Sequence, residues 1–144
     1  MTNTQAQEVV YHNAGNTARV YRNQADAYIM VELTGAVQVS DYREAFTTLL
    51  KELANTGYQK LVFNLKALSK SDPESRAWLM KKFLPQAFHA IKGEAKAAIV
   101  SPTNTFQELA LQMVLDSVQT IAYKTEVKYC QSVEEATAWI TEAH

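Results

Sequence analysis

The chain has 144 residues, of which 47% are hydrophobic and 20% charged, and its formal net charge is −1. This composition is that of an ordinary globular domain, and the near-neutral charge argues against a general nucleic-acid binder, which carries a basic excess. The single cysteine, Cys130, excludes an intramolecular disulfide and a zinc site built from several thiolates.

No apolar run approaches the roughly 20 residues of a membrane span. Residues 1–7 are polar and lack the pattern of a secretory signal. We therefore expect one cytoplasmic domain over residues 1–144, with residues 1–7 flexible and no integral membrane segment.

The first third of the chain predicts antiparallel strands. Gly15 and Asn16 separate the first two runs, and both residue types tolerate the positive φ of a tight hairpin turn. In the third run the side chains alternate, so Ile29, Val31 and Leu33 are expected to face the core. The expected strands are residues 8–13, 17–22 and 27–34.

Farther along, strand patterns alternate with helical patterns that have a 3.6-residue period. Such alternation specifies a parallel sheet with crossover helices. The fold class is therefore α/β, with a mixed sheet and four helices. The expected strands are residues 60–65, 96–101 and 126–130, and the expected helices are residues 40–55, residues 71–91, one that begins at Thr105 and a short one after Ser132.

Polar residues mark the expected helix ends. Ser40 suits the start of the first helix and Gly57 suits a left-handed stop. Pro85 falls inside the second helix, so we expect a kink there and the loss of the hydrogen bond to Lys81. Capping boxes are expected at Ser71 with Glu74, Thr105 with Glu108, and Ser132 with Glu135.

No familiar catalytic or metal-binding motif accompanies this pattern. His12, His89 and His144 lack cysteine or carboxylate neighbours at metal-ligand spacing, and solvated or partly packed histidines are the better interpretation. Cys130 ends a strand and is better explained as a small buried side chain than as a nucleophile. We therefore expect no enzyme activity, no metal and no cofactor.

Residues 66–76 are the main candidate site, because binding sites in open α/β sheets favour the carboxyl ends of strands. Residues 60–100 carry eight basic and three acidic side chains, and a helix N-terminus attracts anions. Two interpretations stay open: a site for a phosphate, a carboxylate or a phosphorylated serine, or an N-cap serine among solvated lysines. The candidate phospho- or anion-binding residues are Ser69, Ser71, Lys66, Lys70 and Arg76.

Aromatic residues of the second helix form another candidate, an apolar surface for a ligand or a partner. Trp78, Phe83 and Phe88 belong to this group, and core packing is their default explanation. The second and third expected helices carry apolar residues on more than one face, and surplus apolar surface often marks a partner site. A second copy of the chain is one such partner.

The arrangement resembles the STAS superfamily, which comprises sulfate-transporter and anti-sigma-factor-antagonist domains, and more narrowly the stand-alone SpoIIAA-like proteins of bacteria. The resemblance covers residues 27–142. It rests on the strand and glycine at 27–35, the helix opening at 40–42, the strand at 61–65 and the S-x-E-E-A ending at 132–136. It implies a SpoIIAA-like β-α superhelix with helices largely on one face, the other face being covered by the N-terminal strands or a second subunit.

In that family, a serine beside the N-terminus of the second helix is a phosphorylation switch within an Asp-Ser-Ser-Gly loop. Here residues 68–73 read LSKSDP, and Asn64 stands where an aspartate often lies. Ser69 and Ser71 are thus candidates by position only. The leading hypothesis is a non-enzymatic regulatory module that binds an unidentified protein partner, and the alternative is a carrier of a small lipid-like or anionic ligand.

Overall fold

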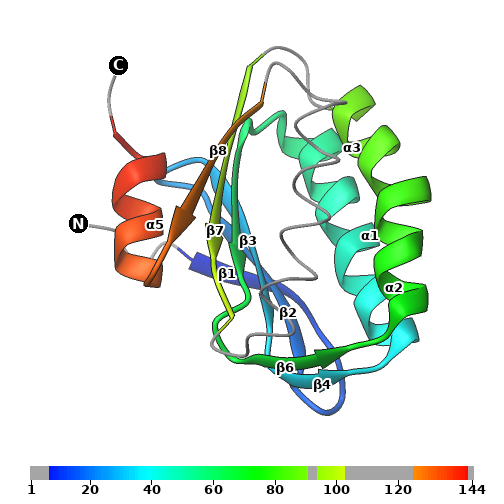
Figure 1. Cartoon of the computed structure of the whole chain (residues 1–144). Coiled ribbons are helices and arrows are strands. Elements are labelled where there is room, and N and C mark those ends of the chain that lie inside the picture. The colour runs from blue at the N-terminus through cyan, green and yellow to red at the C-terminus, as the bar shows by residue number, and fades with distance from the viewer. Residues whose placement is uncertain (1–6, 91–93, 103–124, 143–144) are drawn as a thin grey trace.

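The structure is a computed structural model that describes residues 7–90, 94–102 and 125–142. A six-stranded sheet in the order β1-β2-β3-β5-β7-β8 forms its centre, with helices on both faces, and β4 pairs with β6 in a small second sheet (Figure 1). The strands are β1 (Gln7–His12), β2 (Ala18–Asn23), β3 (Tyr28–Leu33), β4 (Gly35–Val37), β5 (Lys60–Asn64), β6 (Leu68–Ser71), β7 (Ala95–Val100) and β8 (Thr125–Cys130). The helical segments are α1 (Val39–Thr56), α2 (Pro73–Trp78), the π-helical η2 (Leu79–Phe83), α3 (Leu84–Ala90) and α5 (Val133–Ile140).

The large sheet is mixed, as the sequence predicts. β1, β2 and β3 pair antiparallel, whereas β3, β5, β7 and β8 run parallel to their neighbours. All six expected strands are present with bounds within one residue of those predicted. The helix expected from Thr105 lies outside the described residues.

The β1–β2 hairpin is built by asparagines. The Asn13 side-chain oxygen accepts hydrogen bonds from the backbone N–H groups of Thr17, at 2.8 Å, and Ala18, at 3.0 Å. Asn16, and not Gly15, takes the positive φ of the turn, at 55°. The turn therefore depends on side-chain hydrogen bonding as well as on backbone freedom.

β1 contains an irregularity in its pairing with β2. Val9 is opposite Tyr21 and Tyr11 is opposite Val20, so the register shifts between Val9 and Tyr11. An extra residue in one strand of an antiparallel pair bends that strand. As a result Val10 and Tyr11 both pack against the same hydrophobic cluster.

α1 covers β1, β2 and β3 on one face of the sheet (Figure 1). The helix ends at Gly57, whose φ of 72° is the left-handed stop that the sequence predicts. The prediction of a Ser40 cap is wrong, because Gln38 precedes the helix and makes no side-chain capping bond. An Arg22–Glu52 ion pair of 3.0 Å joins β2 to α1. Packing and this ion pair thus position α1.

The second helical segment packs along α1 and is irregular. Asp72, not Ser71, caps α2, because the Asp72 carboxylate accepts the backbone N–H of Glu74 at 2.9 Å. The capping box expected at Ser71 is therefore wrong. The π-helical η2 (Leu79–Phe83) ends two residues before Pro85, which lies in the first turn of α3, so the predicted distortion takes the form of a wider helical turn.

α5 covers the opposite face, over β5, β7 and β8. This overturns the expectation that the N-terminal strands or a second subunit cover that face, because β1 and β2 extend the sheet sideways instead. The second core cluster comprises Tyr28, Met30, Val62, Ala98, Val100, Cys130, Ala136 and Ile140. Within the described ranges, no helix is long and apolar enough to cross a bilayer.

Candidate functional site

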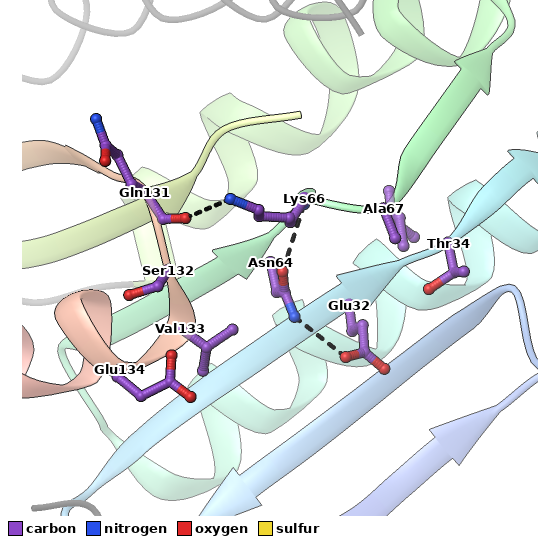
Figure 2. Close-up of a pocket in the computed structure, with 10 residues that line it drawn as sticks. Glu32, Thr34, Asn64, Lys66, Ala67, Gln131, Ser132, Val133 and Glu134 are labelled. Atoms are coloured by element: carbon purple, nitrogen blue, oxygen red, sulfur yellow. Dashed lines mark hydrogen bonds between the residues drawn. The ribbon is translucent and has the colours of Figure 1, made fainter. Parts of the chain in front are cut away.

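A pocket of about 360 Å³ lies at the carboxyl edge of the large sheet, where β3 and β5 end and α5 begins (Figure 2). Parallel strands bring their carboxyl ends to one edge, so segments far apart in sequence meet there. The lining residues are Glu32, Leu33, Thr34, Asn64, Lys66, Ala67, Gln131, Ser132, Val133 and Glu134.

Glu32 is held by two neutral donors. The parallel register places Glu32 of β3 directly beside Asn64 of β5. The Asn64 amide donates to one Glu32 oxygen at 3.1 Å, and the Tyr21 hydroxyl donates to the other at 3.2 Å. The carboxylate is partly buried, and these two bonds fix its position at the pocket.

Lys66 joins two loops across the pocket. Its Nζ donates to the backbone carbonyl of Gln131 at 2.7 Å, although the two residues are 65 positions apart. Figure 2 shows Lys66 extending toward Gln131, while Asn64 points toward Glu32. The loop after β5 and the loop before α5 therefore form one connected rim.

The first turn of α5 completes the rim. The Ser132 hydroxyl accepts the N–H of Glu135 at 3.1 Å, as the sequence predicts. The Glu135 carboxylate accepts the N–H of Gln131 at 3.0 Å, one residue earlier than an ordinary capping box. Both bonds fix the chain that carries Ser132 and Glu134 into the pocket lining.

The candidate anion site is not assembled as one cluster. Ser71 is only 6% exposed, and Arg76 donates both to its hydroxyl, at 2.9 Å, and to its carbonyl, at 2.8 Å. Ser69 and Lys70 are exposed on β6, and Lys66 lies in the pocket rim. The Asp72 carboxylate already accepts one N–H of the first turn of α2, that of Glu74. The predicted residues therefore divide among three settings: Ser71 with Arg76, Ser69 with Lys70 on β6, and Lys66 in the pocket rim.

The basic middle third of the sequence is also divided in space. Lys60 is the first residue of β5 and Lys96 the second residue of β7, at the amino edge of the sheet. Lys66 and Lys70 lie at the carboxyl edge, since they follow the end of β5. The positive charge that the sequence concentrates is therefore shared between two ends of the molecule.

The aromatic candidates belong largely to the core. Phe83 is 3% exposed, and its ring centroid lies 5.1 Å from that of Phe46 and 6.2 Å from that of Trp78. Trp78 is partly buried, with the Arg43 guanidinium 5.7 Å from its ring centroid. The side chain of Phe88 lies outside the described part of the chain. Phe83 thus fills the space between helices instead of presenting a surface.

The Cys130 thiol is not activated as a nucleophile. It is 2% exposed, and burial, together with the hydrogen bond and charge of Glu135, raises its pKa to about 11. The thiol is therefore neutral near pH 7, which opposes use as a nucleophile. Of the histidines, His12 is exposed on β1, while His144 and the side chain of His89 are outside the described residues. Among the residues that can be described, no metal-binding group of histidine, cysteine and carboxylate side chains is found.

Glu32, Gln131 and Glu134 are pocket residues that the sequence did not single out. A signal for Glu32 was available, because it and Asn64 are polar residues near the ends of two otherwise apolar strands. Such residues often serve binding when their strands are parallel neighbours. The adjacency of β3 and β5 was the missing information.

Comparison with known proteins identifies the family. The model of the SpoIIAA-like family matches residues 28–141, which is most of the chain. No curated protein matches the sequence. The mixed sheet, the α/β order and this match agree with the resemblance noted in the sequence, and the chain belongs to the SpoIIAA-like family.

Proposed function

We propose that this SpoIIAA-like domain is a non-enzymatic, cytoplasmic regulatory module that binds another protein through the carboxyl edge of its large sheet. The proposed surface consists of the pocket rim and the adjoining β6, with Lys66, Ser69 and Lys70 as its central residues. The observation that carries the proposal is the meeting of three chain segments around a pocket whose polar groups are already fixed.

Preorganisation supports a binding role for this edge. The bonds Lys66–Gln131 and Asn64–Glu32 hold the loop after β5 against the neighbouring segments. A surface that is rigid before binding loses less conformational entropy when a partner docks. The edge is therefore suited to recognition by shape and charge.

Exposure supports the same assignment. β6 pairs with the short β4 and presents Ser69 and Lys70 to solvent, beside the rim that contains Lys66. A phosphate added to Ser69 would place negative charge between two lysines and change how the edge attracts a partner. Ser69 is preferred over Ser71 for this role because Ser71 is buried and bonded to Arg76.

The chemistry of the described residues favours binding over catalysis. Acid–base catalysis needs titratable groups that can exchange protons with a substrate near neutral pH. Cys130 holds its proton, with a pKa of about 11, and both Glu32 oxygens accept hydrogen bonds from neutral donors. These groups support a structural or recognition role.

Affinity capture with matched charge reversals tests the proposal. Lys70→Glu reverses an exposed charge at the carboxyl edge of the large sheet. The matched control, Lys51→Glu, reverses an exposed charge near the C-terminal end of α1. We expect the wild type and Lys51→Glu to retain a stoichiometric partner, which Lys70→Glu loses. Equal capture by all three proteins would place the interface elsewhere, and capture of a metabolite alone would reject a protein partner.

The proposed partner includes a second copy of the chain, which would make the protein a homodimer. The mass in solution, measured by light scattering during size-exclusion chromatography, distinguishes this case. A dimer that Lys70→Glu dissociates and Lys51→Glu preserves would assign self-association to the carboxyl edge. A monomer at all concentrations would leave a different protein as the partner.

A small-ligand carrier is the second candidate function. The pocket volume of about 360 Å³ falls within the ordinary range of roughly 300–1,000 Å³ for ligand sites. This pocket is at the rim, away from the aromatic residues in which the sequence suggested a cavity. Native mass spectrometry of gently purified protein would show a retained mass if the protein is a carrier, whereas a clean apo mass would reject tight carriage.

A further inference from the structure

We infer that the outer strand β8 pairs antiparallel with β8 of a second copy of the chain. In this dimer Val127 lies on the two-fold axis, and Glu126 of each copy lies opposite Lys128 of the other. The interface is separate from the carboxyl edge, because no residue of β8 lines the pocket. The inference therefore goes beyond the proposed docking edge and does not depend on it.

β8 is a regular outer strand, whereas β1, at the other side of the sheet, is irregular. In the part of the chain that the structure describes, β8 pairs with β7 alone, in unbroken register from Thr125 to Cys130 (Figure 1). β1 contains the register shift described above. An outer strand presents backbone groups with which another strand can pair, and a bulge opposes such pairing. β8 is thus the outer strand that suits a partner.

The backbone of β8 determines which residues face a second copy. The Cys130 carbonyl accepts the N–H of Ser101 at 3.2 Å, so the backbone groups of Cys130 are directed toward β7. These directions alternate along a strand, so Val127 directs its N–H and C=O away from β7. Two residues with such groups exchange both hydrogen bonds in an antiparallel pair. Val127 can therefore pair with its own copy about a two-fold axis.

Charge selects this register. With Val127 opposite itself, Glu126 and Lys128 meet across the interface in a non-hydrogen-bonded pair, where side chains approach most closely. Both side chains are exposed, and none of the ion pairs among the described residues includes either one. A slide of two residues in either direction would place Glu126 opposite Glu126 or Lys128 opposite Lys128. Like charges directly opposite destabilise a sheet, so β8 is complementary to itself in one register.

The other face of β8 contributes apolar surface. Val127 is partly buried against the first core cluster, and Tyr129 is 37% exposed. Tyrosine is enriched at protein interfaces. In the inferred register Tyr129 lies opposite Thr125 of the second copy, so pairing brings an exposed aromatic side chain into the interface.

The orientation of the dimer has a consequence for binding. The two six-stranded sheets become one continuous sheet, in which the β8 strands run in opposite directions. The carboxyl ends of the parallel strands, and with them the two pockets, then lie at opposite ends. One dimer would present two docking edges that point away from each other, which suits two partner molecules or a repeated one.

Sedimentation equilibrium of the full chain tests the inference, in a concentration series up to about 1 mM. We expect the wild type to dimerise. Lys128→Glu places glutamate opposite glutamate at both symmetric positions and should weaken dimerisation roughly tenfold or more. Glu126→Lys places lysine opposite lysine and should weaken it to a similar extent.

A mixture of these two variants is the sharper test. In a pair made from one copy of each, every glutamate of one strand lies opposite a lysine of the other. The mixture should therefore dimerise about as well as the wild type, although neither variant does so alone. Loss of folding in either variant cannot produce this rescue.

A second pair of variants controls for net charge. Lys51→Glu and Glu44→Lys make the same charge changes at exposed positions of α1. Each should dimerise like the wild type, and their mixture should show no gain. Rescue in this mixture as well would mean that overall charge, and not β8, drives association, which would reject the inference.

Three further results would overturn the inference. These are a monomer throughout the series, a dimer that folded Lys128→Glu preserves, and a mixture of the two β8 variants that stays monomeric. A dimer that only Lys70→Glu dissociates would move self-association to the carboxyl edge and would also reject it. If a β8 variant fails to fold, hydrogen exchange of the wild type decides: the Val127 N–H should exchange more slowly as concentration rises, and an unchanged rate rejects the pairing.

Discussion

The two faces of the large sheet are covered in different ways. α1 has 18 residues and lies over β1, β2 and β3, whereas α5 has 8 residues and lies over β5, β7 and β8 on the opposite face. The α1 face holds a continuous aromatic cluster around Phe46. The α5 face ends in the pocket. The long helix lies over a closed core, and the short one leaves a pocket at the carboxyl edge.

The largest effect should come from the centre of the α1 face. Phe46 packs with its ring centroid 4.8 Å from Tyr42 and 5.1 Å from Phe83. Phe46→Ala should lower the free energy of unfolding by about 3–5 kcal/mol, through lost burial and a residual cavity. Ile140→Ala on the α5 face should cost less, about 2 kcal/mol. Urea unfolding measures both, and equal losses would break the comparison of the two faces.

The end of α1 offers a smaller effect with a close control. Gly57 has a φ of 72°, and nothing lies within 4 Å of an added Cβ there. Gly57→Ala should therefore cost about 1–2 kcal/mol from backbone strain alone. Gly15 has equal space and no positive φ, so Gly15→Ala should be neutral or slightly stabilising. Thermal unfolding of both variants checks this, and a matching loss in Gly15→Ala would refute the strain argument.

Loss of the N-cap of α5 should lower the free energy of unfolding by about 1 kcal/mol. Ser132→Ala removes the bond to the Glu135 N–H and should lower stability by about that amount. Because the lost bond caps only α5, hydrogen exchange should quicken in the first turn of α5, where Ser132 lines the pocket, more than in α1. Ser69→Ala at an exposed serine is the control. Uniform quickening in both helices would mean that the cap does not act locally.

The smallest effect concerns Cys130, beneath α5. Burial and Glu135 raise its pKa from 9.0 to about 11, so iodoacetamide at pH 8 should modify the folded protein far more slowly than the urea-unfolded chain. Between pH 9.0 and about 11, the Cys130 thiol stays protonated in the folded state and is deprotonated in the unfolded state. Stability from this group is therefore full below pH 9.0 and is lost as the pH rises toward about 11. Mass spectrometry follows the reaction, and fast labelling of folded protein would show that α5 opens readily.

The sequence predicted the architecture because each large element has a strong local pattern. The apolar run of β5 and the 3.6-residue stripe of α1 are visible without knowledge of any neighbour. β4 and β6 were not predicted, since Gly35–Val37 and Leu68–Ser71 are short and lack periodicity. Their pairing with each other is what makes them strands.

The sequence pointed to residues 66–76, and the pocket lies at the same edge of the sheet, with Lys66 the predicted site residue in its lining. The carboxyl ends of parallel strands follow from the strand order, and Lys66 does lie in the pocket rim. Its bond to Gln131 depends on how two loops meet across the sheet, which no local pattern encodes. Ser71 likewise suits an N-cap in sequence, yet its burial and its contact with Arg76 give that role to Asp72.

The register shift in β1 has a consequence for how molecules meet in concentrated solution. β1 is an outer strand of the large sheet, with Val9 50% exposed, and a flat outer strand invites edge-to-edge pairing with another chain. The extra residue at Val10 bends β1 and interrupts the regular spacing of backbone donors and acceptors that a fibril would need. Removing Val10 should therefore make the protein more prone to aggregate, even where its fold survives.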